Sequence, residues 1–421
     1  MIENLEVSSR KILALLQGTP ELYLNLKFFF VLPEEKKYKL IAPLSSWLQE
    51  FSLTEEDVVD VLDRYSKNIS DLTSIDETCK EIKNWLLTKQ NDNGSWPLAE
   101  DPGVPDRENA WATAVCILSL IKLKIYMNLS DETYDKKILL GIKWFFDENT
   151  NNKYILTKGW KNKLSDSSVN LFDTSIALSA ISKYKEIFCG NEPCDIDNKV
   201  IEITENLLKA SDNKPYWFMS NNENNEADVG LTSMMAMTLI HIYRAFHEQI
   251  SENQKNEIQN IIFLNIEWIC QGYSNDVGWN KNFEKSCYAI QALNKFISYF
   301  SNGFVDAFNN KERIEKINMD ISKILPSEIS KVENSFTHEN DSWGWPAERP
   351  GFKIYVTSLA TSTLLKIHQK LNIIIDFSVI FRAVNTLLEK FVLDEVTLDN
   401  TYRLCTLIDY LRYKKSDVPK Q

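Results

Sequence analysis

The sequence predicts an all-α fold, an (α/α)6 toroid in which a ring of inner helices lies inside a ring of outer helices. Three observations lead to this prediction. A Trp-containing turn recurs about every sixty residues, a period typical of repeat architectures. Apolar residues at helical spacing precede each turn, and a helix that is apolar nearly all round follows it. About six such helical hairpins would close a ring.

The recurring turn is clearest at residues 90–96, which read QNDNGSW. Its later copies keep the Trp, at Trp160, Trp217, Trp279 and Trp345. The first and last copies match over the longest stretch, residues 96–103 (WPLAEDPG) against 345–351 (WPAERPG). We expect each Trp to pack in the outer layer while its indole N–H donates to a carbonyl in the turn.

The predicted inner helices begin about a dozen residues after each Trp, near a Thr, Ser or Cys. They are poor in charge and rich in small and apolar residues, at 113–123, 173–181, 232–242 and 357–367. A hydroxyl at such a position can accept a hydrogen bond from a free N–H at the start of the helix. A further hairpin is predicted from segments 379–393 and 401–411, which brings the number of pairs to about six.

The toroid is predicted to span residues 76–415, after an N-terminal helical segment at 1–75. That segment lacks the Trp turn, but residues 52–55 (SLTE) resemble a capping box. No stretch is long and charge-free enough to cross a bilayer, so no transmembrane segment is expected. The start of the chain has neither the basic region nor the apolar core of a secretory signal, so we expect a cytoplasmic protein.

Charge and composition argue against two kinds of function. The formal net charge of −12 disfavours nucleic acid as a partner, because binding to phosphates depends on clustered Lys and Arg. The seven Cys and four His residues are dispersed, without the spacing of zinc ligands. We therefore expect no metal site built by the protein.

The spacing of Gln90, Gly94 and Trp96, followed by a helix that opens with Thr, resembles the QW-type repeat of the prenyltransferase and squalene-cyclase superfamily. The resemblance covers roughly residues 78–370. It implies an α/α toroid whose central cavity holds an isoprenoid chain. Similar toroids serve protein prenyltransferase β subunits, triterpene cyclases and class II diterpene cyclases, so the fold does not choose among these activities.

The catalytic motifs of that superfamily diverge in this sequence. The class II acid motif, Asp-x-Asp-Asp-Thr, is closest at residues 170–174, but Phe172 stands at the position of the proton donor. The zinc pattern of the protein prenyltransferases fails near Cys287, because Lys285 occupies its Asp position. No cofactor is implied with certainty, and Mg²⁺ enters only if the substrate is a diphosphate.

Three carboxyl groups are candidate acids for a non-standard start of carbocation chemistry: Asp173, Glu100 and Glu348. Such an acid has to stay protonated in a dry pocket. Asp173 matches the last Asp of the class II motif, whereas Glu100 and Glu348 lie in two similar Pro-Gly connections. The structural alternatives are helix capping for Asp173 and turn geometry for the two Glu residues.

Four residues at the starts of inner helices are candidate substrate contacts: Trp111, Phe172, Tyr355 and Thr174. The three aromatic residues hold equivalent positions in the repeat, where their faces would exclude water and stabilise a carbocation. Core packing is the alternative for the aromatic residues, and capping is the alternative for Thr174.

Three functions are compatible with these observations. The first is an isoprenoid cyclase-like enzyme that binds a prenyl diphosphate or polyprene, and the aromatic positions favour it. The second is a catalytically inert toroid that acts as a protein-interaction scaffold or regulator in a bacterium, since repeat surfaces often serve recognition. The third is a carbohydrate-active (α/α)6 enzyme with two carboxylates, which is weaker because the repeat points elsewhere.

Overall fold

The computed structural model describes residues 72–98, 108–147, 155–156, 159–160, 170–190, 194–217, 227–274, 278–279, 283–300, 310–339, 342–346, 353–371, 373, 375–389 and 397–416. The chain divides into two compact units, Met1–Glu77 and Thr78–Gln421. Nearly all of the first unit lies outside the described residues. The predicted helical segment at residues 1–75 and its boundary with the toroid at 76–415 therefore stay predictions.

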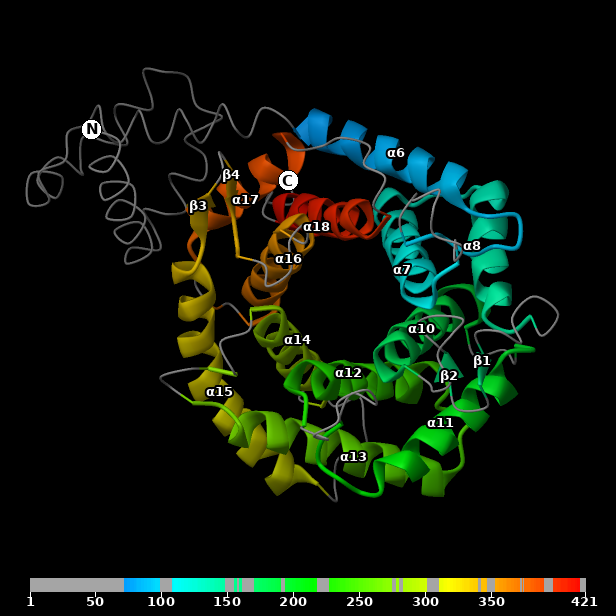
Figure 1. Cartoon of the computed structure of the whole chain (residues 1–421). Coiled ribbons are helices and arrows are strands. Elements are labelled where there is room, and N and C mark those ends of the chain that lie inside the picture. The colour runs from blue at the N-terminus through cyan, green and yellow to red at the C-terminus, as the bar shows by residue number, and fades with distance from the viewer. Residues whose placement is uncertain are drawn as a thin grey trace, which may run out of the picture. The chain divides into compact units, whose positions relative to one another are not determined.

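Six inner helices form a closed ring in the described part of the chain (Figure 1). They are α7 (Ala110–Met127), α10 (Leu171–Tyr184), α12 (Val229–Ala245), α14 (Phe283–Phe300), α16 (Lys353–Leu371) and α18 (Thr397–Ser416). Each packs against the next, and α18 packs against α7. The predicted all-α toroid is confirmed.

Six outer helices surround this ring (Figure 1). They are α6 (Leu72–Lys89), α8 (Glu132–Trp144), α11 (Asp197–Ser211), α13 (Glu252–Gln271), α15 (Lys311–Asn334) and α17 (Phe377–Glu389). Two connections from an outer to an inner helix contain small antiparallel hairpins. Strand β1 (Ile155–Leu156) pairs with β2 (Gly159–Trp160), and β3 (Thr337–Glu339) pairs with β4 (Ser342–Gly344). A single-turn π-helix, η3 (Lys185–Cys189), continues α10.

Burial explains the contrast between inner and outer helices. Helix α11 is amphipathic and buries one face through Val200, Ile203 and Leu207, whereas α7 is buried on most sides. By length and composition α7 is also the one described helix that could cross a membrane, but most of it is buried inside the ring. An apolar sequence on all sides is what an inner helix requires.

Two hydrogen bonds build the recurring turn. The backbone N–H of Trp96 donates to Oγ1 of Thr113 over 2.9 Å, and its indole N–H donates to the carbonyl of Leu86 over 2.8 Å. The pairing of a Trp backbone with a Thr hydroxyl recurs at Trp160 with Thr174 (3.0 Å), Trp217 with Thr232 (3.0 Å) and Trp345 with Thr357 (3.4 Å). These Thr hydroxyls therefore fasten the preceding turn to the inner helix.

Other side chains cap the inner helices. The side chains of Asn109, Asn170 and Asp228 accept hydrogen bonds from backbone N–H groups in the first turns of α7, α10 and α12. Each of these residues stands four positions before the Thr of its repeat. The expectation that the Thr residues cap these three helices is wrong, because short Asn and Asp side chains already fill the cap position.

Gln90 and Gly94 also have structural roles in the first turn. Gly94 has a φ of 99°, and a Cβ added there would come within 2.3 Å of the carbonyl oxygen of Leu140. Only Gly avoids both problems. Nε2 of Gln90 donates to the carbonyls of Gly94 and Lys137, each over 2.9 Å. The spacing of Gln, Gly and Trp is thus explained by the turn itself, without a ligand.

Replacing Thr174 with Val should lower the free energy of unfolding by about 1–2 kcal/mol, because it leaves the N–H of Trp160 buried without an acceptor. Thr174 is fully buried, and Val preserves its shape. Urea unfolding followed by circular dichroism measures the loss. Thr88→Val is the matched control, since its hydroxyl is exposed and donates to the carbonyl of Trp85 in the same helix. Equal effects of the two substitutions would contradict the role assigned to Thr174.

Glu333 in α15 gives the fold a pH dependence. Burial raises the pKa of Glu333 to about 7, although the backbone N–H of Asp376 donates to its Oε1 over 2.5 Å. Between about pH 4.5 and 7 the folded chain holds a proton that the unfolded chain releases, so its stability falls as the pH rises.

We expect Glu333→Gln to remove that fall, which is worth roughly 2–3 kcal/mol. The variant should therefore gain stability relative to the wild type between pH 4.5 and pH 8, as measured by urea unfolding. Glu315→Gln, at an exposed position in the same helix, should show no such gain. If the difference in unfolding free energy between Glu333→Gln and the wild type does not change with pH, Glu333 does not titrate in this range.

Candidate functional site

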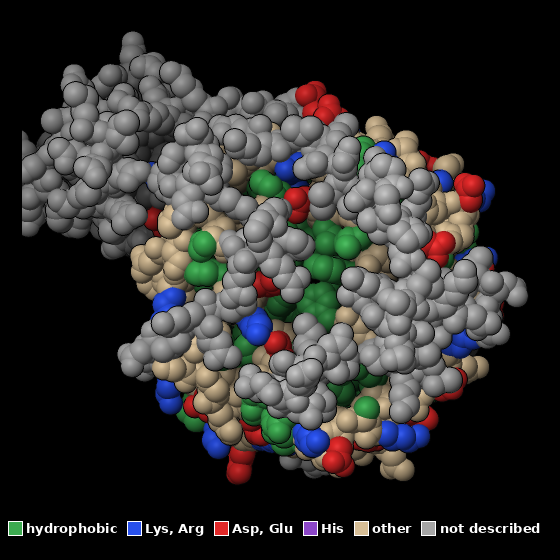
Figure 2. Space-filling model, viewed as in Figure 1, with side chains coloured by type: hydrophobic (Ala, Val, Ile, Leu, Met, Phe, Trp, Pro, Cys, Tyr) green, Lys and Arg blue, Asp and Glu red, His purple; other side chains and the backbone are tan. Residues whose placement is uncertain are grey.

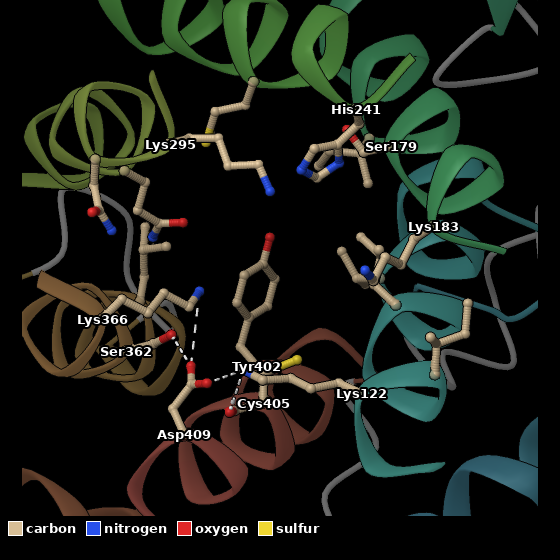
Figure 3. A pocket seen from close by; sticks show the side chains of 18 of the residues that line it. Lys122, Ser179, Lys183, His241, Lys295, Ser362, Lys366, Tyr402, Cys405 and Asp409 are labelled. Atoms are coloured by element: carbon tan, nitrogen blue, oxygen red, sulfur yellow. Dashed lines mark hydrogen bonds and ion pairs between the residues drawn. The ribbon is translucent and has the colours of Figure 1, made fainter. Parts of the chain in front are cut away.

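A cavity of about 670 Å³ lies inside the ring, and all six inner helices line it (Figure 3). It extends toward the C-terminal ends of these helices, because its walls include Lys122, Lys183, Arg244, Lys370 and Arg412, which lie near those ends. Its volume is within the range of small-molecule sites. This cavity is the candidate functional site.

Aromatic side chains gather near the opposite, N-terminal ends of the inner helices. Trp111 packs edge to face with Phe172 (5.2 Å between ring centroids) and Tyr355 (6.1 Å). Phe172 packs against Tyr288 (6.2 Å), and Tyr355 against Tyr402 (4.6 Å). Hydroxyl groups of Tyr288 and Tyr355 bond to each other. Hydrophobic side chains gather in the middle of the ring in Figure 2.

None of the four predicted substrate contacts lines the 670 Å³ cavity. Trp111 packs against both Phe172 and Tyr355. Tyr355 also donates to Oε1 of Glu284 over 2.7 Å. Thr174 bonds the backbone of Trp160. The structure gives each of them a packing or bonding role, and a role in substrate binding stays a prediction.

The predicted acids also lie apart from the cavity or outside the described residues. Asp173 is buried in the first turn of α10, where the helix dipole favours a carboxylate, and it does not line the cavity. Asn170 caps this helix, and its Oδ1 accepts from the N–H groups of Phe172 (2.9 Å) and Asp173 (3.2 Å). Glu100 and Glu348 are outside the described residues. Their role as acids stays a prediction.

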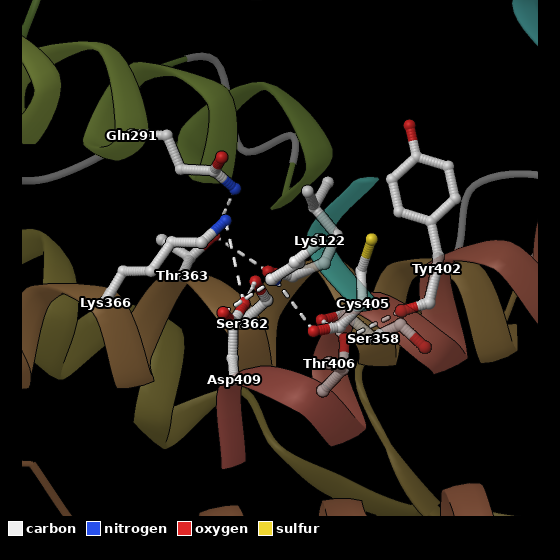
Figure 4. A network of polar contacts seen from close by, with 11 residues as sticks. Lys122, Gln291, Ser358, Ser362, Thr363, Lys366, Tyr402, Cys405, Thr406 and Asp409 are labelled. Carbon is white, nitrogen blue, oxygen red and sulfur yellow. Dashed lines mark hydrogen bonds and ion pairs between the residues drawn. The ribbon is translucent and has the colours of Figure 1, made fainter. Parts of the chain in front are cut away.

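Asp409 in α18 is the centre of a polar network on the cavity wall (Figure 4). Its Oδ1 lies 2.6 Å from Nζ of Lys122, and its Oδ2 lies 3.8 Å from Nζ of Lys366. The hydroxyl of Ser362 donates to Oδ2 over 2.5 Å. Burial opposes the ionisation of Asp409, but the two lysines outweigh it and hold its pKa below the usual value. Asp409 is therefore a carboxylate fixed between two cations.

Cations outnumber acids on the cavity wall. Glu186 and Asp409 are the carboxylates among the lining residues. The cations are Lys122, Lys183, Arg244, Lys295, Lys366, Lys370 and Arg412. Several stand near helix C-termini, whose partial negative charge favours them. The cavity is thus positive in a chain of net charge −12. Within the described ranges, no group of three or more His, Cys, Asp or Glu residues is placed to hold a metal ion.

Lys295 and His241 point into the same part of the cavity, and the hydroxyl of Tyr402 points toward that space (Figure 3). Burial, reinforced by Arg244 and Lys370, lowers the pKa of Lys295 to about 7. Burial and then the charge of Lys295 lower the pKa of His241, so its ring is neutral at pH 7. Nδ1 of His241 is buried and has no hydrogen-bond partner among the described residues. An amine with a pKa near neutrality, Lys295, and a neutral imidazole, His241, therefore face one space.

The sequence contains a signal for this site outside the catalytic motifs of the resembled superfamily. Lys stands nine positions after the Thr of the repeat in three units: Thr113 and Lys122, Thr174 and Lys183, Thr357 and Lys366. In the unit that contains Thr232 the same position is His241. Nine residues are two and a half helical turns, which carries these side chains from the N-terminal end of each inner helix to the cavity.

Solved structures with a similar fold include carbohydrate-processing enzymes. A family 76 glycoside hydrolase from a bovine Bacteroides thetaiotaomicron strain has a TM-score of 0.55 and 13% identity, over 82% of this chain and 78% of that chain. An α-1,6-mannanase from Salegentibacter sp. HEL1_6 has a TM-score of 0.52 and 10% identity, over 81% and 99%. A D-mannose isomerase has a TM-score of 0.50 and 9% identity, over 82% and 98%. No family model and no curated protein matches the chain.

These neighbours correct the reading of the repeat. The isoprenoid hypothesis is wrong. Several of the matched toroids are glycoside hydrolases and one is a sugar isomerase, a different superfamily from the terpene cyclases, and two mannanase structures contain mannotriose or mannotetrose. The predicted isoprenoid ligand and the predicted cyclase function are therefore wrong as well. The inert scaffold gains no better support. The repeat did not predict the activity, because Gln90, Gly94 and Trp96 stabilise a turn. This structural role is the same whatever reaction the toroid catalyses.

Proposed function

We propose that this protein processes a carbohydrate in the ring cavity by transferring protons on a reducing sugar. Its fold is shared with glycosidases and with a D-mannose isomerase, which supports a sugar as substrate. The walls offer the hydrogen-bonding groups that sugar hydroxyls need, among them Ser179, Gln291 and Asn294. Apolar residues such as Ile176 and Met234 would face the carbon skeleton.

The carboxylates of the cavity argue against hydrolysis by a carboxyl pair. That mechanism needs one carboxylic acid that is protonated and donates to the leaving oxygen. Asp409 has a lowered pKa and is held by Lys122 and Lys366, so it is ionised at neutral pH. Glu186 is bound by Lys183 over 2.7 Å and by Arg244 over 3.4 Å. Neither carboxylate is placed as a proton donor.

Interconversion of an aldose and a ketose uses the groups that are present. In this reaction one proton moves from C2 to C1 and another from O2 to O1, with no atom gained or lost. A base for such a step works best with a pKa near the operating pH. Lys295, with a pKa of about 7, would carry the carbon-bound proton, and neutral His241 would accept from a sugar hydroxyl. The single observation that carries the proposal is this pair in one cavity.

Incubation of the protein with free hexoses, hexose phosphates and hexuronic acids in D₂O tests the proposal. We expect the paired aldose or ketose to appear by NMR, with deuterium at C1 or C2. Lys295→Gln should reduce the rate at least about a hundredfold, since general acid–base catalysis contributes about that much. Lys311→Gln, exposed on outer helix α15, should retain the wild-type rate. Absence of exchange, or cleavage of manno-oligosaccharides that is unaffected by Lys295→Gln, would refute the proposed reaction.

A further inference from the structure

We propose that Arg244, Lys295 and Lys370 form a subsite for an anionic group, a phosphate or carboxylate carried by the sugar; this inference rests on the proposed function. The three cations come from consecutive inner helices, α12, α14 and α16. We name them the cation triad. The ligand class that follows is a sugar phosphate or a uronic acid, rather than a neutral sugar.

The cation triad stands where two cavities meet. All three residues line the 670 Å³ cavity, and all three also line a second cavity of about 310 Å³. The other residues around the second cavity are Ile297, Ser298, Tyr299 and Leu371, none of which is acidic. Arg244 and Lys370 are exposed and Lys295 is partly buried, so an anion from solvent can reach the triad at the mouth of the main cavity.

The positive charge of the triad is poorly compensated. Glu186 lies 3.4 Å from Nε of Arg244, but no carboxylate of the described residues forms an ion pair with Lys295 or Lys370. Lys370 instead donates to the hydroxyl of Ser298 over 3.5 Å. Like charges that share a partly desolvated space repel one another, and a bound anion would relieve that repulsion.

On the other side of the cavity most of the cations are paired with carboxylates, so the two sides differ in net charge. This difference would orient the ligand. Lys122 and Lys366 share Asp409, and Lys183 pairs with Glu186. Arg412 donates to the carbonyl of Lys122 over 3.3 Å. Uncompensated charge therefore concentrates at α12, α14 and α16. A sugar with its anionic group on the exposed Arg244 and Lys370 of the triad would extend inward past Lys295, toward His241 and Tyr402, which leaves the amine of Lys295 beside the sugar carbons.

Isothermal titration at pH 8 tests the subsite with four probes: glucose, glucose 6-phosphate, glucuronate and inorganic phosphate. We expect at least one of the two charged sugars to bind at least about tenfold more tightly than glucose, which is the scale of one hydrogen-bonded ion contact. An anion beside Lys295 should also raise its pKa, so binding should take up protons. Titrations in two buffers of different ionisation enthalpy measure that uptake.

The double variant Lys295→Met/Lys370→Gln should lose both the preference and the proton uptake, whereas Lys311→Gln should keep them. A melting temperature at or above the wild-type value shows that the double variant is folded. Equal affinities for glucose, glucose 6-phosphate and glucuronate, or a preference that survives in the double variant, would overturn the subsite and leave the proposed function standing. Binding of phosphate that requires the triad, with no binding of any sugar, would support the subsite and contradict the proposed function.

The two charged sugars separate the sources of the anion. Preference for glucose 6-phosphate alone assigns the triad to phosphate, and preference for glucuronate alone assigns it to carboxylate. Either result supports the subsite.

Discussion

Replacing Lys295 with Met is expected to raise the free energy of unfolding at pH 6 by roughly 3 kcal/mol. In the folded chain the pKa of Lys295 is lowered to about 7 by burial and by Arg244 and Lys370, against about 10.4 in an unfolded chain. The figure is discounted from 1.36 kcal/mol per pKa unit because the side chain is partly exposed. The same substitution should abolish turnover, because it removes the proposed base.

The pH dependence of this gain follows from the direction of the shift. Between about pH 7 and 10.4 the unfolded chain binds a proton at Lys295 that the folded chain does not bind, so wild-type stability rises with pH. The advantage of Lys295→Met is therefore complete below pH 7 and disappears near pH 10. Urea unfolding at pH 6, 8 and 10 measures it, with Lys311→Met as the exposed control. A gain that is independent of pH would show that it comes from packing instead.

Asp409→Ala should have the opposite effect and cost about 3–5 kcal/mol at pH 7, because it strands Lys122 and Lys366 without their shared counter-charge. The folded pKa of Asp409 is lowered, so its contribution is present above the unfolded pKa of about 3.9 and is lost as the pH falls through the folded value. The unfolding free energies of the wild type and of Asp409→Ala should therefore become similar only below about pH 4. Chemical unfolding at pH 7 and pH 3 compares them.

Two further variants separate charge from packing at this position. Asp409→Asn keeps the shape and an acceptor for Ser362, and it should still show most of the loss. The double variant Lys122→Met/Asp409→Leu removes the main pair together and should recover part of the stability, since buried pairs can be replaced by apolar residues. If Asp409→Asn does not lower the free energy of unfolding, the charge of the carboxylate is not what stabilises the two lysines.

The fold could be predicted because its signals are local. Trp96, Trp160, Trp217 and Trp345 each bond a Thr that follows within about twenty residues, so one repeat contains both partners. The contrast between α7 and α11 likewise follows from burial patterns within each helix. The capping residues were missed because Thr113 and Asn109 both suit a helix start, and only coordinates show which one bonds it.

The candidate site could not be predicted in the same way, because its charges come from helices far apart in the sequence. Lys122 and Asp409 meet only after the ring closes. The lowered pKa of Lys295 depends on burial and on Arg244 and Lys370 from two neighbouring helices, none of which the sequence places together. The catalytic motifs of the resembled superfamily also fall at the N-terminal ends of the inner helices, whereas the cavity extends toward their C-terminal ends.

The contact between Lys122 and Asp409 has a consequence for assembly, because it joins the first inner helix to the last. Nζ of Lys122 also donates to the carbonyl of Cys405, and Arg412 donates to the carbonyl of Lys122. These contacts join α7 to α18 across nearly three hundred residues of sequence. Closing so long a loop is entropically costly and slow. The wall that would receive a ligand thus depends on closure of the ring, and a chain truncated before α18 should leave both the ring open and the wall incomplete.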